Sequence, residues 1–438
     1  MTKIKFYSGL KEIGGTVVAV ETGKAICIFD FGFAYAARID DKLKTRAGSE
    51  VSDYIKLGVL NRLDGVYEKE VSHELGLKGY GEIDKKIFVI ISHMHIDHMG
   101  GLGALAPELP VYMSRDSMTL YREMGVTGEL EIREHKNILP MDYDASINIE
   151  DIKVTCIQVD HDVIGACGFM IETEDGKIAY TGDYRLHGYH PQISRDFAEK
   201  CKGVDYLISE GVTVSFDDVD ILSLEGPVRT NSEWTLLDDV EKYAVEEEGL
   251  IVINNYNRNV ERMHHMIEKI HLSGREVLLD EVQGSYIAAF YPQDDFKIYL
   301  PEGGTPAFSK VKDKEVITRK ELFETPSKYV LQQDYKDSYE LFDIHQCISL
   351  YLHMDGAPLG NYDPSYDKLY AMLEVLGINV IKCGLGGHAE PYCLRNTIDI
   401  IAPSTLIPLH SFRPEQLKSE RAKEIILPEP GDEIVFTK

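Results

Sequence analysis

Short apolar runs that end in a histidine or an aspartate recur along this chain. The run 87–91 predicts a buried strand, and it leads into the segment 93–98, which holds three histidines and one aspartate. Similar strands are predicted at 156–160, 178–182 and 405–409, followed directly by His161, Asp183 and His410. In a layered α/β fold, reactive side chains gather where strands end and loops begin. We therefore expect these strand ends to meet in one constellation.

The second half of the chain has its own alternation of strands and helices. Strands are predicted at 250–253, 276–279, 296–300 and 346–352, with a helix at 260–272. This block lies between the early strand ends and His410, so the chain must return to the first unit after it. We expect an α/β protein with a first domain at 1–211, an inserted domain at 212–380 and a C-terminal return to the first domain at 381–438.

The segment His93-Met94-His95-Ile96-Asp97-His98 has the composition of a metal-binding loop. Neutral imidazole and carboxylate are ligands that zinc, manganese and iron accept. Four of them in one loop can coordinate two adjacent metal ions if other parts of the chain complete the coordination. The alternative is a polar loop that happens to be rich in histidine, but unpaired polar groups beside a core are destabilising. The segment therefore predicts a metal-dependent enzyme.

The composition of the chain indicates the cell compartment in which we expect the protein. The chain has 438 residues, of which 44% are hydrophobic, enough for two or three domains with cores of their own. No apolar stretch approaches the length of a membrane span, and the N-terminus lacks the apolar region of a signal peptide. The seven cysteines are odd in number and scattered, which favours reduced thiols. Together these features predict a cytoplasmic protein that does not associate with a membrane.

The residues at the strand ends resemble those of a known family. The spacing His93-x-His95-x-Asp97-His98, with His161, Asp183 and His410, is similar to the seven-ligand pattern of metallo-β-lactamase-fold hydrolases. Ser209-Glu210, Gly387-His388-Ala389 and Pro408-x-His410 resemble motifs A, B and C of the β-CASP branch of that fold, in particular of ribonuclease J. The resemblance covers nearly the whole chain. It implies an α/β fold, namely a metallo-β-lactamase αββα sandwich with an inserted α/β β-CASP domain.

The resemblance also implies a role for each ligand. One metal ion would lie on His93, His95 and His161, the other on Asp97, His98 and His410, and Asp183 would bridge them. The expected cofactors are two divalent metal ions, zinc first, with manganese as the alternative because it accepts the same ligands. Asp97 is counted among the catalytic residues as well as the ligands.

Two further residues of the motifs are expected to take part in catalysis. Two cations about 3.5–4 Å apart can hold a bridging hydroxide at neutral pH and stabilise the leaving oxygen. His388 is then free to donate a proton to the leaving group, and a hydrogen bond that His388 donates to Glu210 could keep it protonated.

One loop departs from the family pattern. The family has His-Ser-Ile-Pro-Gly after the third motif, whereas this chain has His161-Asp162-Val163-Ile164-Gly165. Asp162 removes no ligand, but a carboxylate beside the site could alter the metal preference.

Asn257 and Arg258 stand between the predicted strand 250–253 and the predicted helix 260–272. Backbone amides at a helix start, together with a guanidinium, can bind a phosphate. Ribonuclease J relatives have a similar loop, and a capped helix start with a solvated arginine is the alternative. With Ala389 of motif B, these two residues are the expected substrate-binding residues.

The expected function is a two-metal phosphodiesterase that hydrolyses RNA, or single-stranded DNA, by a metal-bridging hydroxide. The net charge of −27 argues against long-range attraction of a polyanion, although two divalent cations would place positive charge where the phosphate lies. The alternatives are a small-molecule metallo-hydrolase of the same fold, acting on a lactone, ester or β-lactam, and a di-iron electron-transfer protein. The sequence leaves open whether cleavage is exonucleolytic or endonucleolytic, and whether the chain forms a homodimer.

Overall fold

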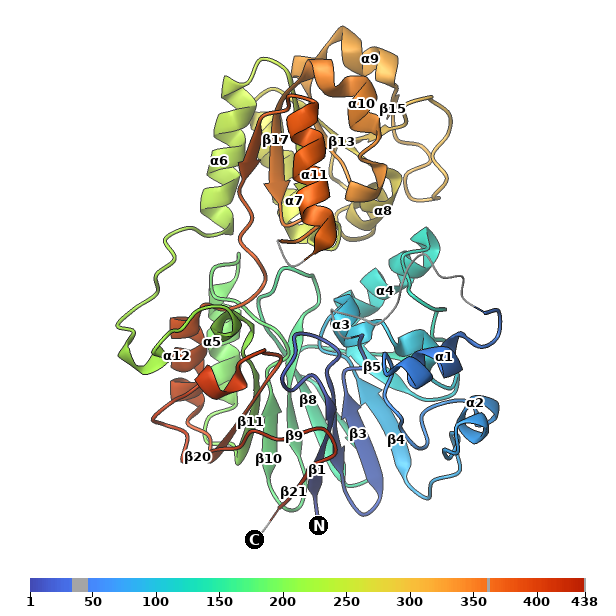
Figure 1. Cartoon of the computed structure of the whole chain (residues 1–438), viewed down its shortest axis with the longest axis vertical. Coiled ribbons are helices and arrows are strands. Elements are labelled where there is room, and N and C mark those ends of the chain that lie inside the picture. The colour runs from blue at the N-terminus through green and yellow to red at the C-terminus, as the bar shows by residue number, and fades with distance from the viewer. Residues whose placement is uncertain (34–45, 361–362, 437–438) are drawn as a thin grey trace.

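The computed structural model describes residues 1–33, 46–360 and 363–436, which form two lobes (Figure 1). The lower lobe contains two seven-stranded sheets, and the upper lobe contains a third sheet of the same size. Within these described ranges, no helix combines the length and the apolar character that crossing a bilayer requires.

The first sheet of the lower lobe has the strand order β21-β1-β2-β3-β4-β5-β6. Strands β3 to β6 are parallel, whereas β21, β1 and β2 are antiparallel to their neighbours. The strand bounds are β1 Lys3–Ser8, β2 Val17–Glu21, β3 Ala25–Phe29, β4 Lys86–Ile90, β5 Val111–Ser114, β6 Ile138–Met141 and β21 Glu433–Val435.

The second sheet has the order β20-β19-β11-β10-β9-β8-β7. Strands β10, β11, β19 and β20 are parallel, and β7 to β10 form an antiparallel meander. The bounds are β7 Ser146–Ile149, β8 Ile152–Gln158, β9 Cys167–Glu172, β10 Lys177–Tyr180, β11 Tyr206–Glu210, β19 Thr405–Leu409 and β20 Glu424–Ile425.

The two sheets of the lower lobe pack face to face. Because side chains alternate between the two faces of a strand, Cys27 and Phe29 of β3 enter the core between the sheets, whereas Ile28 packs on the helix side. Cys156 of β8 joins them from the second sheet. The helices of this lobe are α1 Glu50–Leu57, α2 Lys69–Glu74, α3 Ile96–Met99, α4 Arg115–Thr127, α5 Pro191–Lys200 and α12 Pro391–Ile401. Helices α1 to α4 cover the first sheet and α5 and α12 cover the second, which confirms the expected αββα sandwich.

The third sheet is entirely parallel, with the order β15-β14-β13-β16-β12-β17-β18. Its strands are β12 Leu250–Asn255, β13 Glu276–Leu279, β14 Lys297–Tyr299, β15 Val316–Ile317, β16 Tyr329–Gln332, β17 Ile348–Met354 and β18 Val380–Lys382. Its helices are α6 Glu233–Glu246, α7 Val260–Leu272, α8 Glu281–Phe290, α9 Arg319–Glu324, α10 Glu340–Ile344 and α11 Pro364–Val375.

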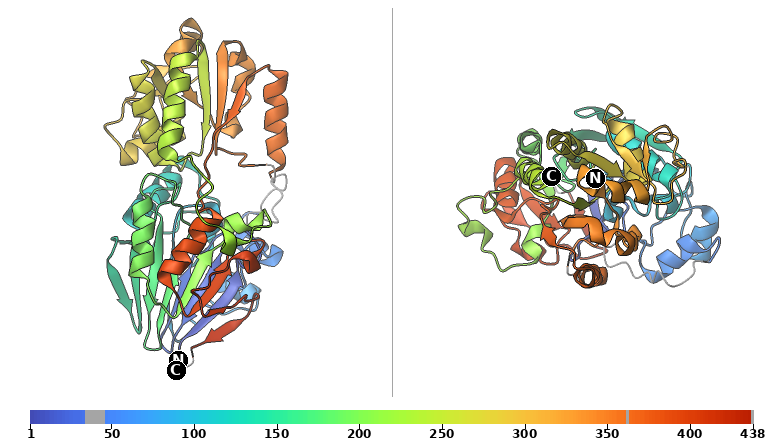
Figure 2. Two further views of the ribbon diagram at one scale, coloured as in Figure 1. Left: turned by 90° about the vertical axis from the view of Figure 1, so that its left-hand side faces the viewer. Right: turned by 90° about the horizontal axis from the view of Figure 1, so that it is seen from above.

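Helices lie on both faces of the third sheet (Figure 2), as parallel sheets require. Leu237 of α6 and Met263 of α7 pack on one face, and Leu341 of α10 and Leu369 of α11 pack on the other. The chain enters this lobe after β11 and returns from β18 to α12 and β19 of the lower lobe (Figure 1). The expected α/β unit inserted into the sandwich is therefore present.

Candidate metal centre

All seven residues predicted as metal ligands lie at one end of the lower lobe. His93 and His95 follow β4, His161 follows β8, Asp183 follows β10 and His410 follows β19. Asp97 and His98 lie on the short helix α3, which begins at Ile96. The apolar strands fix the backbone at each position, so the polar residue that follows is held at the rim of the sandwich.

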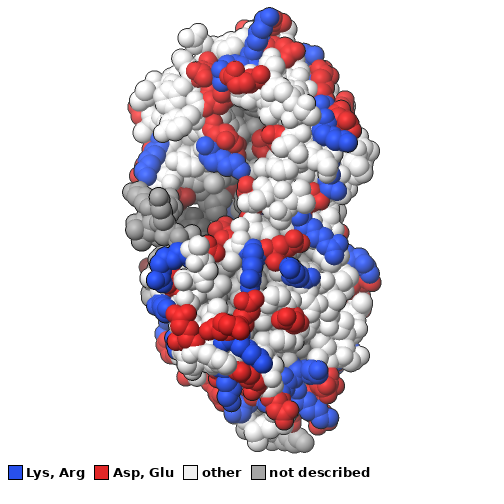
Figure 3. Space-filling model, turned by 90° about the vertical axis from the view of Figure 1, so that its right-hand side faces the viewer, with Lys and Arg blue, Asp and Glu red and all other residues white. Residues whose placement is uncertain are grey.

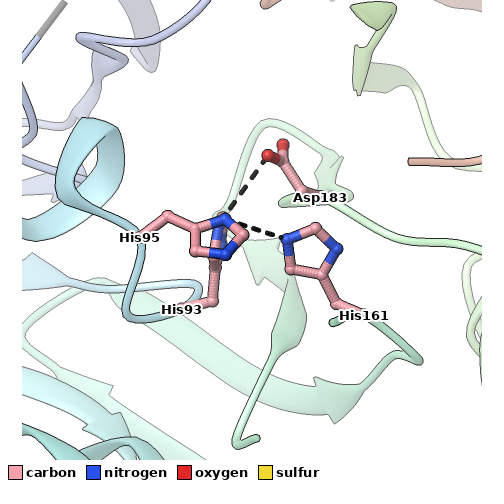
Figure 4. Close-up of side chains that lie close together, drawn as sticks. All are labelled: His93, His95, His161 and Asp183. Carbon is pink, nitrogen blue, oxygen red and sulfur yellow. Dashed lines mark hydrogen bonds and ion pairs between the residues drawn. The ribbon is translucent and has the colours of Figure 1, made fainter. Parts of the chain in front are cut away.

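The first group of ligand atoms comes from His93, His95, His161 and Asp183. Their side chains point toward one another (Figure 4). Nδ1 of His95 lies 3.1 Å from His93 Nε2 and 3.2 Å from His161 Nε2. Asp183 Oδ2 lies 3.7 Å from His93 Nε2. These atoms surround a single point, as the ligands of a metal ion do.

The second group comes from Asp97, His98 and His410. Oδ2 of Asp97 lies 3.8 Å from His98 Nε2 and 3.5 Å from His410 Nε2. Asp183 Oδ2 is within reach of this group too, at 3.2 Å from His98 Nε2 and 3.3 Å from His410 Nε2. Asp183 therefore stands between the two groups.

Asp30 orients His98 of the second group by binding its Nδ1 atom, the ring nitrogen that does not face the other ligands. Its Oδ2 accepts a hydrogen bond from His98 Nδ1 at 2.7 Å, and its Oδ1 accepts one from the Ser92 N–H at 2.7 Å. Asp30 has a φ of 60°, a left-handed conformation that aspartate tolerates better than most residues. A carboxylate behind a ligating imidazole fixes the ring orientation and raises its basicity.

The loop before His388 and the residue after His161 orient the first group. His161 Nδ1 donates to the carbonyl oxygen of Gly387 at 2.7 Å. Asp162 Oδ1 lies 3.3 Å from His95 Nε2 and 3.3 Å from His161 Nε2. The sequence singled out Asp162 as a departure and Gly387 only as part of a motif. Neither contact could be read from it, because each joins segments that are distant in the chain.

His388 lies beside both groups. Its Nδ1 is 3.3 Å from Glu210 Oε2 and 3.8 Å from Asp183 Oδ2. Burial alone would lower the pKa of His388, but the carboxylates of Glu210 and Asp183 outweigh it and raise the pKa to about 10. Glu210 is fully buried and accepts hydrogen bonds from the backbone N–H groups of Tyr184 and Val212. The structure therefore brings Glu210 and His388 together as an ion pair at the edge of the cluster.

The three residues predicted to bind substrate lie in different surroundings. Arg258 Nη1 donates to the carbonyl oxygen of Met94 at 2.8 Å, so it reaches the ligand loop from the upper lobe. Asn257 Nδ2 donates to Asp334 at 2.8 Å, within the upper lobe. Ala389 is buried, its N–H donates to Tyr184, and its carbonyl accepts from Thr213 Oγ1. Of the three, Arg258 alone touches the loop that carries the ligands.

The donor set fits divalent metal ions. His98 Nε2, Asp183 Oδ2 and His410 Nε2 are buried and have no hydrogen-bond partner among the described residues, although they face one another. Leaving such atoms unpaired costs about 1–3 kcal/mol each, and a bound cation would satisfy all three. Burial lowers the pKa of His93, and it lowers that of His161 to about 3. Both imidazoles are therefore neutral at pH 7, which is the form that binds a metal ion.

Comparison with known proteins agrees with this geometry. A family model described as "Beta-lactamase superfamily domain" matches residues 79–233. Ribonuclease J of Pyrococcus abyssi is 24% identical over 292 residues, which is 64% of this chain and 58% of that protein. Ribonuclease J of Mycoplasma pneumoniae is 22% identical over 441 residues, which is 93% of this chain and 68% of that protein.

A solved structure matches over almost the full length. It is a protein of unknown function from Enterococcus faecalis, with a TM-score of 0.83, 28% sequence identity and 99% coverage of both chains. The fold, the matched domain and the relatives agree with one another. The chain is a metallo-β-lactamase-fold protein similar to the ribonucleases J.

Proposed function

We propose that this protein is a two-metal phosphodiesterase of the β-CASP branch that hydrolyses RNA. One observation carries the proposal: a buried glutamate and a histidine, Glu210 and His388, form an ion pair at the edge of a seven-residue ligand cluster. The pair stands at the positions that resemble motifs A and B of the β-CASP branch, and a small-molecule hydrolase leaves that resemblance unexplained. The names of the ribonuclease J relatives support RNA as the substrate.

We assign the ligands as follows. His93, His95 and His161 would hold one divalent ion, Asp97, His98 and His410 would hold the other, and Asp183 would be shared. Zinc is the proposed metal, with manganese as the alternative. When bound, two such cations supply Lewis acidity to a phosphodiester and lower the pKa of water towards neutrality.

The residues of the chain supply the remaining steps. His388 would give a proton to the oxygen that leaves the phosphorus, and Glu210 would hold its imidazole in the charged form and in position. Arg258, anchored on the Met94 carbonyl, would keep the upper lobe over the ligand loop and face the phosphate backbone. We also propose that residues 212–380 form the unit that closes over the RNA strand. The third sheet supports this division, although its last strand, β18, continues to Lys382.

Cleavage of labelled RNA tests the proposal. Protein loaded with zinc or manganese should cleave 5′-labelled single-stranded RNA, and His388→Ala should lower kcat by at least about 100-fold. The variant must still bind two metal ions. A lower metal content would mean that His388 is itself a ligand. Equal cleavage by the wild type and the variant would exclude the proposed role of His388.

A small-molecule hydrolase of the same fold is the second candidate, and the charge of the protein favours it. The net charge is −27, and on the face seen in Figure 3 acidic and basic side chains are interspersed, without a continuous basic band. Long-range attraction of RNA is therefore weak. Turnover of a lactone or a β-lactam, with no cleavage of RNA or single-stranded DNA by either metal form, would establish this candidate.

A further inference from the structure

A cavity of about 520 Å³ lies in the upper lobe, away from the metal cluster. Asp280 follows β13, Leu300 follows β14 and Gln333 follows β16, and all three line it. The cavity therefore lies at the carboxyl ends of parallel strands, where ligands bind in open α/β sheets. Its volume is within the range of small-molecule sites, roughly 300–1,000 Å³.

The charge around this cavity is negative. Five carboxylates and one ammonium group line it. The ammonium of Lys336 is paired with Glu129 of the lower lobe at 2.9 Å, and Glu340 is paired with Arg319 at 2.7 Å. Asp280 and Asp337 have no cationic partner among the described residues. A ligand of this cavity would therefore have to be positively charged.

Two buried oxygen atoms of residues that line the cavity lack a hydrogen-bond donor among the described residues. Gln333 is 5% exposed, and its Nε2 donates to the Asp337 carbonyl at 2.9 Å, which leaves Oε1 without a partner among the described residues. Asp280 Oδ1 accepts from the N–H groups of Val282 and Gln283, at 2.8 and 2.9 Å, whereas Oδ2 has no partner. Burial raises the pKa of Asp280 to about 6, as expected for a carboxylate without a cation. The ligand must therefore bring N–H donors as well as charge.

The walls of the cavity favour an organic cation over a metal ion. Within the described residues, the groups of three or more side chains close enough to hold a metal ion all belong to the lower-lobe cluster. Phe308, Leu331 and Tyr299 give this cavity apolar and aromatic walls. Such walls suit a hydrocarbon chain, and an aromatic face attracts an ammonium group.

We propose that this cavity binds an aliphatic polyamine, with one ammonium group between Asp280 and Gln333 and the methylene chain against Phe308 and Leu331. The site is separate from the metal cluster, so it does not depend on the nuclease activity. The cavity also contacts the residues predicted to bind substrate. Asp334, which lines the cavity, accepts the hydrogen bond from Asn257, next to Arg258.

Calorimetric titration of the full chain with spermidine tests the proposal. At about 0.15 M salt, where weak surface attraction is screened, the wild type should bind one spermidine per chain. Asp280→Asn keeps the Oδ1 acceptor that caps α8 and removes the charge, so it should weaken binding at least tenfold. Asp337→Asn, at the exposed rim, should weaken it several-fold without disturbing the fold.

The matched control is Asp313→Asn, which removes one exposed charge of the same lobe outside the cavity. It should leave spermidine affinity within twofold of the wild type. Equal losses in the Asp280 and Asp313 variants would show attraction by the overall charge and overturn the proposal. The absence of saturable binding of spermidine and of putrescine would overturn it as well.

Discussion

Glu233 Oε1 lies 2.7 Å from Arg262 Nη2, and both side chains are fully buried. The same carboxylate pairs with Arg185, which in turn pairs with Asp160 at 3.1 Å. At the other end, Arg262 pairs with Asp355, whose carboxylate accepts hydrogen bonds from the N–H groups of Leu385 and Gly386. One ionic network therefore joins the two lobes to the segments that precede His161 and Gly387.

Replacing Glu233 by glutamine should destabilise the protein strongly. The change leaves two buried guanidiniums without their common partner, which costs about 3–5 kcal/mol. Burial alone would raise the pKa of Glu233, but Arg262 and Arg185 outweigh it and lower the pKa to about 2, from 4.5. The stabilisation is therefore complete above pH 4.5 and is lost as the pH falls towards 2.

Thermal unfolding of metal-free protein measures this effect. The difference in Tm between wild type and Glu233→Gln should be largest at pH 7 and should shrink below pH 4.5. Glu246→Gln, an exposed glutamate of the same helix, should leave Tm within about 1 °C. A difference that did not change with pH would show that the carboxylate charge is not what stabilises the network.

Asp30→Asn should weaken metal binding in the second group of ligands. Asparagine tolerates the positive φ but presents an N–H2 group or a neutral oxygen to His98 in place of the carboxylate. Loss of such a partner typically lowers metal affinity about 10- to 100-fold. Competition with a chelator measures it, and Asp144→Asn, also at positive φ but on the surface, is the control. Unchanged affinity in Asp30→Asn would contradict the role of Asp30.

Asp162→Asn should act on the other group. Its carboxylate contacts His95 and His161, both of the first group, and does not contact His98 or His410. The variant should therefore lose one metal ion at chelator concentrations at which the wild type keeps two. The metal content after dialysis, measured by mass spectrometry, distinguishes this outcome from loss of both ions, which would mean that the groups do not bind separately.

Gly387→Ala should displace His161. A Cβ atom at this position would lie 2.6 Å from His161 Cε1 and 2.5 Å from Asp162 Oδ1, closer than real Cβ contacts allow. We expect at least a tenfold loss of activity with a lowered metal content. Gly23→Ala, where a Cβ would meet nothing within 4 Å, should behave as the wild type. Full metal content and activity in Gly387→Ala would show that the loop moves freely.

Removal of the metal should lower the stability of the lower lobe. Without a cation, Asp183 Oδ2 and the Nε2 atoms of His98 and His410 remain buried without partners. Treatment with a chelator should lower Tm by at least about 5 °C, and zinc should restore it. An unchanged Tm would mean that no ion contributes to folding.

The parts of the fold that follow from local patterns were predictable. The helix expected at 260–272 is α7, and the strand expected at 276–279 is β13. Helical periodicity defines the first and an apolar run defines the second, so both follow from local sequence. The strand before His161 was expected to reach residue 160, but β8 ends at Gln158. Asp160 leaves the sheet because its carboxylate binds Arg185 and the N–H of His190.

Contacts between distant segments were not predictable. No motif or period of the sequence links Glu233 to its partners Arg185 and Arg262, which are 48 and 29 residues away. The contact between Asp30 and His98 and the cavity at Asp280 were not predictable either, because both form only when the sheets have been assembled. The motifs located the seven residues predicted as ligands, which the structure brings together, and the tertiary structure showed which residues hold them in place.

The place of β19 in the second sheet bears on how the protein is synthesised. This strand pairs with β11 along five residue pairs and carries His410 at its end, although some 200 residues separate the two strands. A growing polypeptide on the ribosome therefore has an open edge at β11 until β19 has been synthesised. A product terminated early, anywhere in the upper lobe, would lack His410 and could not assemble the second group of ligands. Activity would thus arise only in chains whose translation has passed that point.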